Sequence, residues 1–233
     1  DNSVAGETTT GQLGSALSFD GIDDAVSIPD LAAYNNAIGT WTFWFKTDGV
    51  WGTDATTPDD SASIISKNDG PGGQEGISVT LTKGGRFLMQ AKDTAVGTPK
   101  CQILTNPAID YADDAWHHVA FVYNTGTGGG VDMYIDGVFN RLCTNTEAWS
   151  FGAYPMKLGD ANDPYWEEYA GEIDEVRIYD EALSATEIKY IYSTTKELIG
   201  HWRLDETSGT TLADDSGNGN NGSWYDDSVG GAD

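Results

Sequence analysis

Aspartate residues gather in the glycine-rich turns of this 233-residue sequence, where their oxygens could bind a metal ion. Asp20, Asp23 and Asp24 fall within one short turn, and a second acidic, glycine-rich loop spans 214–220. Calcium takes roughly six to eight oxygen ligands from carboxylates, amides and backbone carbonyls, and such turns supply all three. The same side chains also cap turns by accepting hydrogen bonds from backbone N–H groups, so the residues alone leave two interpretations open.

The histidines do not form a recognisable catalytic or zinc-binding pattern. His117 and His118 are neighbours in a strand-like run, where successive side chains point to opposite faces. They therefore cannot bind one ion together, and His201 is distant in the sequence. We place no third partner for a zinc site or a Ser-His-Asp triad, so we predict structural roles.

The two cysteines do not have the spacing of a metal site. Cys101 and Cys143 both fall in strand-like stretches, CQILT and FNRLC, which could meet across adjacent strands. We predict one disulfide between them, which would indicate an oxidising, extracellular location. Two separate buried thiols are the alternative.

Aromatic residues outside the strand-like runs are candidate sugar contacts. Trp51 lies in a Gly/Asp loop, Trp149 follows the hairpin that ends at Cys143, and Tyr165 and Trp166 lie between acidic residues in NDPYWEEY. Exposed rings stack on sugar faces, while carboxylates bond sugar hydroxyls. We predict ligand binding at these four residues, and the alternatives are a protein contact or a cover over the core.

Composition excludes several classes of function. Twelve Lys and Arg against 37 Asp and Glu give a net charge of −25, which repels nucleic acid and anionic lipid. No apolar run approaches the ~20 residues that span a bilayer, so we do not expect an integral membrane protein. Asp1 is an unusual start for a nascent chain, and we interpret the sequence as a mature or excised fragment.

Short runs of alternating apolar and polar residues dominate the chain. In TWTFWFK, for example, Trp41, Phe43 and Phe45 share one face, whereas Thr42 and Trp44 share the other. Many such runs, separated by Gly, Asp, Asn and Pro, predict an all-β fold with two antiparallel sheets in a sandwich or jelly roll. One short helix is expected near 184–192, because Ser184 and Glu187 have the spacing of a capping box.

An ordered set of segments between Ala16 and Tyr192 resembles a known family. The segments are ALSFDGIDDAVSIP, TFWFK, WHHVAFVY, MYIDG and GEIDEVRIYDEALSATEI. Together they resemble the LamG-like, concanavalin A-like jelly roll of bacterial surface and secreted proteins. This family includes glycan-binding modules, adhesion domains and some glycoside hydrolases, so the fold does not decide the function.

The resemblance implies a structural calcium ion, Ca²⁺, between the first strand, the turn after the second strand and the last strand. Carried onto this chain, it implies ligands from Asp174, Asp205 and backbone carbonyls near Asp20 and Gly21.

The segment from Glu172 to Arg177 is superficially similar to the E-I-D-x-x-E signature of retaining β-glucanases on this fold. In those enzymes two glutamates act as nucleophile and acid/base, about 5 Å apart. Here Arg177 replaces the second glutamate, and Glu175 would point away from Asp174 in a regular strand. We therefore predict a protein that is not an enzyme.

The C-terminal segment resembles the strand with which domains of this family usually begin. We interpret 1–196 as the jelly-roll body and 197–233 as a segment that supplies the missing first strand, beside the EVRIYD strand. The segment would close on its own body or insert into another copy of the chain. A cut through a tandem array is the third reading.

The leading prediction is an extracellular or cell-surface, non-catalytic module that binds glycans or glycoproteins in adhesion or polysaccharide attachment. One alternative is a structural subunit of a filament that assembles by strand exchange through 197–233. The other is a polysaccharide-active hydrolase, which the missing glutamate disfavours.

Overall fold

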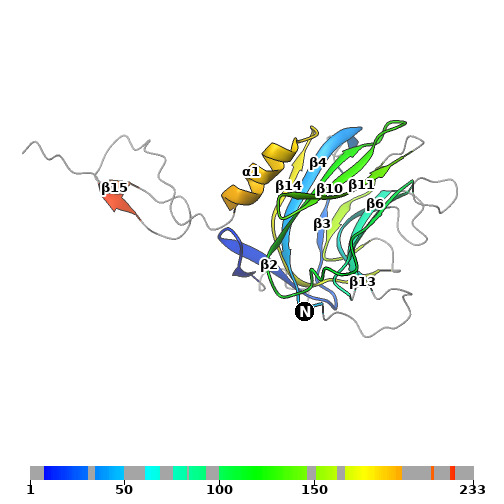
Figure 1. Cartoon of the computed structure of the whole chain (residues 1–233). Coiled ribbons are helices and arrows are strands. Elements are labelled where there is room, and N and C mark those ends of the chain that lie inside the picture. Colours follow the sequence, from blue (N-terminus) through cyan, green and yellow to red (C-terminus); the bar gives the residue numbers. More distant parts are fainter. Residues whose placement is uncertain are drawn as a thin grey trace, which may run out of the picture.

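The structure, a computed structural model, describes residues 8–30, 35–49, 61–68, 76–82, 84–92, 100–145, 151–161, 166–195, 211–212 and 221–223. Two curved sheets face each other, and one helix lies outside them (Figure 1). This arrangement confirms the predicted all-β sandwich with a single short helix. The division at 196/197 stays a prediction, because residues 196–210 lie outside the described ranges.

The first sheet has seven strands, all paired antiparallel. In spatial order they are β1 (Thr8–Thr10), β2 (Ser15–Asp20), β14 (Ala170–Tyr179), β4 (Ile38–Lys46), β9 (His117–Asn124), β10 (Gly130–Ile135) and β11 (Val138–Thr144).

The second sheet has six strands in its main order and a two-residue strand that pairs parallel with one of them. The main order is β3 (Val26–Ile28), β12 (Met156–Leu158), β5 (Ser61–Asn68), β6 (Gly76–Thr82), β7 (Phe87–Lys92) and β8 (Cys101–Leu104). The short strand β13 (Glu167–Glu168) pairs with β5, while β15 (Thr211–Leu212) and β16 (Gly222–Ser223) pair with each other.

The core lies between the two sheets and is rich in aromatic rings. Trp41, Phe43 and Phe45 of β4 all belong to it, as the alternation in the sequence predicts. Trp44 points to the outer face, where its ring stacks on Tyr192 with centroids 5.5 Å apart. Burying such side chains from both sheets is the main driving force for the sandwich.

Helix α1 (Ala185–Thr195) covers part of the outer face of the first sheet. The predicted capping box is present: the Glu187 N–H donates to Ser184 Oγ at 3.3 Å, and the Ser184 N–H donates to Glu187 Oε2 at 2.7 Å. Ile188 packs against Ala120 and Tyr134 of the sheet. No helix of the described part is long and apolar enough to cross a membrane.

The predicted disulfide joins Cys101 to Cys143, with Cα atoms 5.6 Å apart. Cys101 begins β8 and Cys143 lies in β11, so the bond links the edge strands of the two different sheets. The sequence placed the pair on adjacent strands, and the structure places those strands opposite each other across the sandwich. The bond therefore closes one side of the core.

A fully buried lysine ties three segments of the second sheet together. Lys67 Nζ lies 2.7 Å from Asp30 Oδ1 and donates to the carbonyls of Gly152 and Tyr154 at 2.8 and 2.6 Å. The ammonium group also lowers the pKa of the Asp30 carboxyl through their hydrogen bond. All three ammonium protons thus have acceptors, which makes the burial of the charge tolerable.

We expect Lys67→Met to lower the free energy of unfolding by about 2–4 kcal/mol, because two partly buried carbonyls and Asp30 lose their fully buried donor. Chemical denaturation measures the loss. Lys189→Met, on the exposed face of α1, is the matched control and should change stability by less than about 0.5 kcal/mol. Equal effects of the two substitutions would contradict the bonding role of Lys67.

His117 and His118 point to opposite faces of β9, as predicted, and their pKa values shift in opposite directions. Burial opposes protonation of His117, but hydrogen bonds to Asp136 (2.8 Å) and Asp113 (3.1 Å) outweigh it and raise the pKa. Burial against Trp44 and Tyr192 lowers the pKa of His118 from 6.5 to about 4. No described residue hydrogen-bonds its ring nitrogens.

Acidification should therefore act through His118. Below pH 6.5 His118 of the unfolded chain binds a proton, whereas His118 of the folded protein binds one only near pH 4. As the pH falls across that window, this group alone therefore lowers the free energy of unfolding by about 3 kcal/mol. His118→Asn should flatten this part of the pH profile in denaturant titrations. His117→Asn should have the opposite effect, because the raised pKa of His117 contributes stability at low pH that is lost as pH rises. Parallel profiles for both variants would refute this assignment.

Candidate functional site

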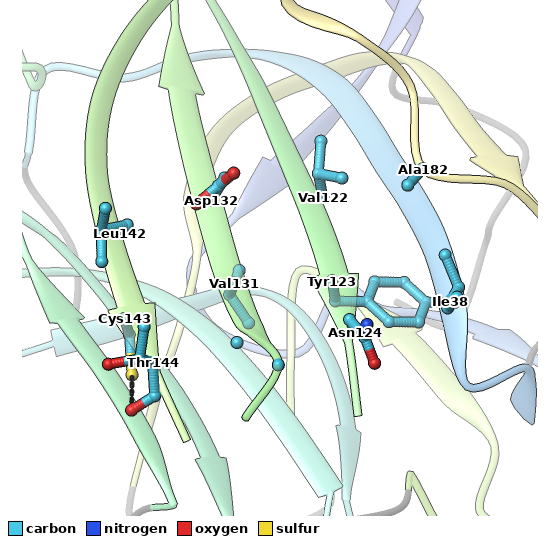
Figure 2. A pocket seen from close by; sticks show the side chains of 12 residues that line it. Ile38, Val122, Tyr123, Asn124, Val131, Asp132, Leu142, Cys143, Thr144 and Ala182 are labelled. Atoms are coloured by element: carbon cyan, nitrogen blue, oxygen red, sulfur yellow. Dashed lines mark hydrogen bonds between the residues drawn. The ribbon is translucent and has the colours of Figure 1, made fainter. Parts of the chain in front are cut away.

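A groove lies on the outer face of the first sheet, beside Ala182 (Figure 2), which comes three residues before α1 begins. It has a volume of about 310 Å³ and is open to solvent. Its walls come from β4, β9, β10 and β11, from the loop before β10 and from Ala182. The lining residues are Ile38, Val122, Tyr123, Asn124, Gly129, Gly130, Val131, Asp132, Leu142, Cys143, Thr144 and Ala182.

Strand pairing places one row of side chains along the groove. Asp132 pairs with Val122 on one side and with Leu142 on the other, so the three side chains cross three neighbouring strands in a line (Figure 2). Leu142 is 55% exposed, which is unusual for a large apolar side chain. The row thus has a carboxylate between two apolar side chains.

A second row has a gap that opens the groove. Asn124 pairs with Ile38 and Gly130, and Gly130 pairs in turn with Thr144. A Cβ atom on Gly130 would lie 1.9 Å from the Cys143 carbonyl oxygen, so only glycine fits. The missing side chain leaves space between Asn124 and Thr144.

The polar side chains of the groove are available to a ligand. Asn124 Oδ1 accepts a hydrogen bond from the Gly126 N–H at 2.9 Å, and its NH₂ group donates to no residue that the structure describes. In the described part of the chain, no residue hydrogen-bonds the Asp132 carboxylate or the Thr144 hydroxyl. The described residues that line the groove include no Lys or Arg, and they present acceptors, neutral donors and apolar walls.

Sequence reasoning missed this groove. The signals that could have found it are the glycine run before β10 and the outward-facing Leu142. Which residues of β9, β10 and β11 lie in one row depends on how the strands pair, and the sequence of a single strand does not determine that pairing.

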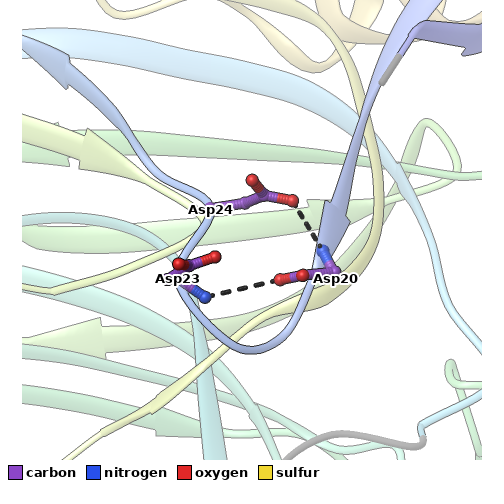
Figure 3. A group of neighbouring side chains, drawn as sticks. All are labelled: Asp20, Asp23 and Asp24. Carbon is purple, nitrogen blue, oxygen red and sulfur yellow. Dashed lines mark hydrogen bonds between the residues drawn. The ribbon is translucent and has the colours of Figure 1, made fainter. Parts of the chain in front are cut away.

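The acidic turn after β2 gathers three carboxylates (Figure 3). One oxygen of each of Asp20, Asp23 and Asp24 lies within 4.8 Å of the others. Asp20 Oδ1 accepts hydrogen bonds from the N–H groups of Ile22 (2.8 Å) and Asp23 (3.4 Å), and Asp24 Oδ2 accepts one from the Asp20 N–H (3.1 Å). In the structure, Asp20 and Asp24 therefore do cap the turn by accepting hydrogen bonds from backbone N–H groups. Each carboxylate still has an oxygen for a cation.

The calcium ligands implied by the resemblance do not converge. Asp20 pairs with Ala170, four residues before Asp174 on β14, which separates the two by about 13 Å along the strand. Ligands of one calcium ion lie within about 2.6 Å of it, so Asp174 cannot share an ion with Asp20 or Gly21. Asp205 lies outside the described residues.

Asp174 instead fixes the backbone around it. Its Oδ2 accepts a hydrogen bond from the Leu13 N–H at 3.0 Å, and its Oδ1 accepts one from the Glu175 N–H at 2.7 Å. The bond from Leu13 attaches the turn between β1 and β2 to β14, and the bond from Glu175 lies within β14 itself.

The predicted aromatic contacts are mostly untested. Trp51, Trp149 and Tyr165 lie outside the described residues. Trp166 is only 7% exposed and packs with Leu88 and Ala161, so the exposed ring predicted from its acidic neighbours is wrong. Its apolar contacts with the second sheet outweigh the polarity of the surrounding sequence.

The glucanase-like strand holds ion pairs. Lys46 Nζ lies 3.8 Å from Glu172 and 3.1 Å from Asp114, and the hydrogen bond to Asp114 raises the pKa of the lysine. Arg177, at the place of the second glutamate, pairs with Glu175. The strand is irregular here, because a register shift lies between Asp174 and Arg177 and Glu175 has a φ of 52°.

Known structures share this fold. The binding domain of Paraclostridial Mosquitocidal Protein 1 has a TM-score of 0.63 at 16% identity; the match covers 81% of this chain and 45% of that one. This chain thus spans less than half of that domain. No curated protein has a matching sequence.

Two carbohydrate-related modules match over most of their own length. Domain 4 of AbnA, an extracellular arabinanase from Geobacillus stearothermophilus solved with arabinotriose, has a TM-score of 0.56 at 20% identity over 79% of this chain and 80% of that one. The CBM40 of the Ruminococcus gnavus IT-sialidase has a TM-score of 0.56 at 16% identity over 76% and 96%. At these identities the likeness shows the fold alone.

A family model extends the likeness to the sequence itself. The model of the concanavalin A-like lectin/glucanase superfamily matches residues 20–189, which run from the acidic turn to α1. This range contains most of both sheets and every residue of the groove. The chain therefore belongs to the concanavalin A-like lectin/glucanase superfamily.

Proposed function

We propose that this protein is an extracellular, non-catalytic module that binds neutral glycans in the groove of β9, β10 and β11. The observation that carries the proposal is the row of Val122, Asp132 and Leu142, in which a carboxylate that no described residue hydrogen-bonds lies between two apolar side chains. Sugars present hydroxyl groups beside patches of C–H, and such a row matches both.

The charge of the groove supports neutral ligands. The neighbour from Ruminococcus gnavus has been solved with sialyllactose, which is an anion. Here Asp132 lies in the groove, its lining contains no Lys or Arg among the residues that the structure describes, and the whole chain carries −25. A carboxylated sugar would therefore be repelled, whereas a neutral sugar would meet the hydrogen-bonding groups of Asp132, Asn124 and Thr144.

The absence of an enzymatic role and the extracellular location are parts of the same proposal. Arg177 stands at the position of the second glutamate of the glucanase signature, and Arg177 pairs with Glu175. The Cys101–Cys143 disulfide fits an oxidising compartment. Adhesion or attachment to a polysaccharide or glycoprotein is the role that such a module would serve.

Removal of the Asp132 carboxylate should weaken glycan binding by about 10- to 100-fold, because a hydrogen bond to a charged group contributes about 1.5–3 kcal/mol. The measurement is affinity electrophoresis of Asp132→Ala in gels that contain neutral polysaccharides, after an array has identified the ligand. Glu168→Ala, a carboxylate change on the second sheet, should leave retention unchanged. Equal retention of both variants would exclude the groove, and release of reducing sugar would refute the non-catalytic role.

We also propose that the structural calcium ion binds at the acidic turn of Asp20, Asp23 and Asp24. Three carboxylates within 4.8 Å, backbone carbonyls of the same turn and water could supply the required oxygens. The turn connects β2 of the first sheet with β3 of the second. A bound ion would thus stabilise the connection between the sheets.

Millimolar calcium should raise the melting temperature by several degrees, and a chelator should reverse the increase, because the ion binds only the folded turn. Asp23→Asn should abolish the increase. Asp174→Asn is the discriminating control: it should lower the melting temperature but keep the calcium increment. Loss of the increment in Asp174→Asn alone would restore the ligand set that the resemblance implies.

A further inference from the structure

We propose that His117 is a pH-sensitive latch, which holds the segment before β9 against one end of the sandwich and loosens it when the imidazole ring becomes neutral. This segment, here called the strap, comprises residues 106–116 and joins β8 to β9. The proposal is independent of the groove and of glycan binding. It rests on the two carboxylates that flank one ring and on the unequal way in which those carboxylates are held.

The strap covers one end of the core with the buried ring of Tyr111. This residue is 6% exposed, and its ring packs on Phe87 with centroids 5.5 Å apart. The Tyr111 N–H donates to the Gly85 carbonyl at 2.9 Å, and the Tyr111 hydroxyl accepts a hydrogen bond from Asn140 Nδ2 at 3.1 Å. A strap that lifts would therefore expose an aromatic side chain that belongs to the core.

Beyond Tyr111 the strap is bonded to the His117 ring. His117 Nε2 lies 3.1 Å from Asp113 Oδ1 of the strap, and His117 Nδ1 lies 2.8 Å from Asp136 Oδ2 in the turn between β10 and β11. An ionised carboxylate only accepts hydrogen bonds, so both ring nitrogens must donate. A neutral imidazole has a single N–H, and only the imidazolium form has two. The contacts of the held strap thus require a charged ring.

The other described groups that pack on His117 carry no charge. The ring contacts Phe45 of β4, with centroids 5.7 Å apart, and Tyr111, with centroids 5.4 Å apart. Burial raises the pKa of the Tyr111 hydroxyl, which therefore stays neutral. Lys46, the residue after Phe45, pairs with Asp114 of the strap at 3.1 Å. This pair contributes little to holding the strap, because the Asp114 side chain is 70% exposed.

The direction of the pH dependence follows from the two carboxylates. Burial opposes protonation of His117, but the hydrogen bonds and charges of Asp136 and Asp113 outweigh it and raise the pKa of the ring. The charged ring therefore persists through the ordinary range of a histidine, about pH 6.5, and the strap stays held there. As the pH rises through the raised pKa, the ring becomes neutral and the strap loosens.

The two carboxylates are not held equally, and this difference decides which bond breaks. Asp136 Oδ1 accepts a hydrogen bond from the His118 N–H at 3.0 Å, and the Asp136 N–H donates to the His118 carbonyl at 2.8 Å. Asp113 Oδ1 also accepts from the Ala115 N–H, but that bond lies within the strap, and the Asp113 side chain is 47% exposed. The remaining ring proton therefore stays on Nδ1, facing Asp136. The Nε2 lone pair then faces the Asp113 carboxylate, and the two repel each other.

Limited proteolysis with chymotrypsin tests the proposal, because cleavage after Tyr111 requires an open strap. The full chain is compared with Asp113→Asn at about pH 6 and about pH 9, and fragments are identified after reduction of the Cys101–Cys143 bond. In Asp113→Asn the side-chain amide accepts from a charged ring and donates to a neutral one, so the strap stays held at both pH values. The ratio of the two cleavage rates cancels the pH dependence of the protease.

We expect the rate for the unmodified chain, divided by the rate for Asp113→Asn, to rise about 10-fold between the two pH values, because a charge-assisted hydrogen bond is lost. Cleavage after Phe121, within β9, reports unfolding of the sheet and should be at least about 10-fold slower than cleavage after Tyr111. An unchanged ratio would overturn the proposal. Cleavage after Phe121 as fast as after Tyr111 would also overturn it, because the whole domain would then open rather than the strap.

Nuclear magnetic resonance of the ring nitrogens provides a second, independent readout, with the His117 signals assigned by their absence in His117→Asn. The unmodified chain should show a pKa above the ordinary 6.5, Asp113→Asn should show a lower one, and the neutral ring should carry its proton on Nδ1. A pKa at or below 6.5 in the unmodified chain would overturn the latch. A neutral ring protonated on Nε2 would do the same, because the bond to Asp113 would then survive.

Discussion

The alternation of inward-facing and outward-facing side chains along β4 is the constraint on which the rest of the structure depends. This strand lies near the middle of the first sheet, between β14 and β9, and nearly all of its residues are buried. Its inner face, with Trp41, Phe43 and Phe45, sets the aromatic core to which the second sheet is fitted. Its outer face carries Thr42 and Trp44, which need a cover of their own. Because both faces are apolar or sparsely polar, the strand is stable only with a sheet below it and a helix above it.

The outer cover explains why the groove lies where it does. Helix α1 covers the sheet along β4 and part of β9 and β10, through Ile188 and Tyr192. The far ends of β9, β10 and β11 extend beyond the helix, and there Leu142 and Asp132 meet solvent. The candidate site is thus the part of the outer face that α1 leaves uncovered. The candidate groove and helix α1 thus occupy different parts of the same sheet face, and the extent of the helix sets the boundary between them.

Local sequence patterns predicted the elements well, but not the distances between them. Alternation identified the strands of both sheets, and the capping box of Ser184 and Glu187 identified the start of α1, because both signals are contained within a few residues. Register is non-local. Whether Asp174 lies beside Asp20 depends on the offset between β14 and β2, and that offset places Ala170 there instead. Local polarity gave a wrong prediction for Trp166, because its acidic neighbours suggested an exposed ring, yet the second sheet buries it. Lys67, for which the sequence led to no prediction, is buried although it is charged. In each case a distant segment supplies the partner, and no local window contains it.

The disulfide between the two edge strands has a consequence for mechanical load. Cys101 and Cys143 are 42 residues apart in sequence, and the chain between them includes all of β9 and β10. A pulling force applied to segments outside this interval passes directly through the covalent bond. About 150 Å of extended chain is therefore withheld from unravelling. Under such a force the protein would keep β9, β10 and most of β11 as a covalently closed loop, even after the outer strands had been peeled away.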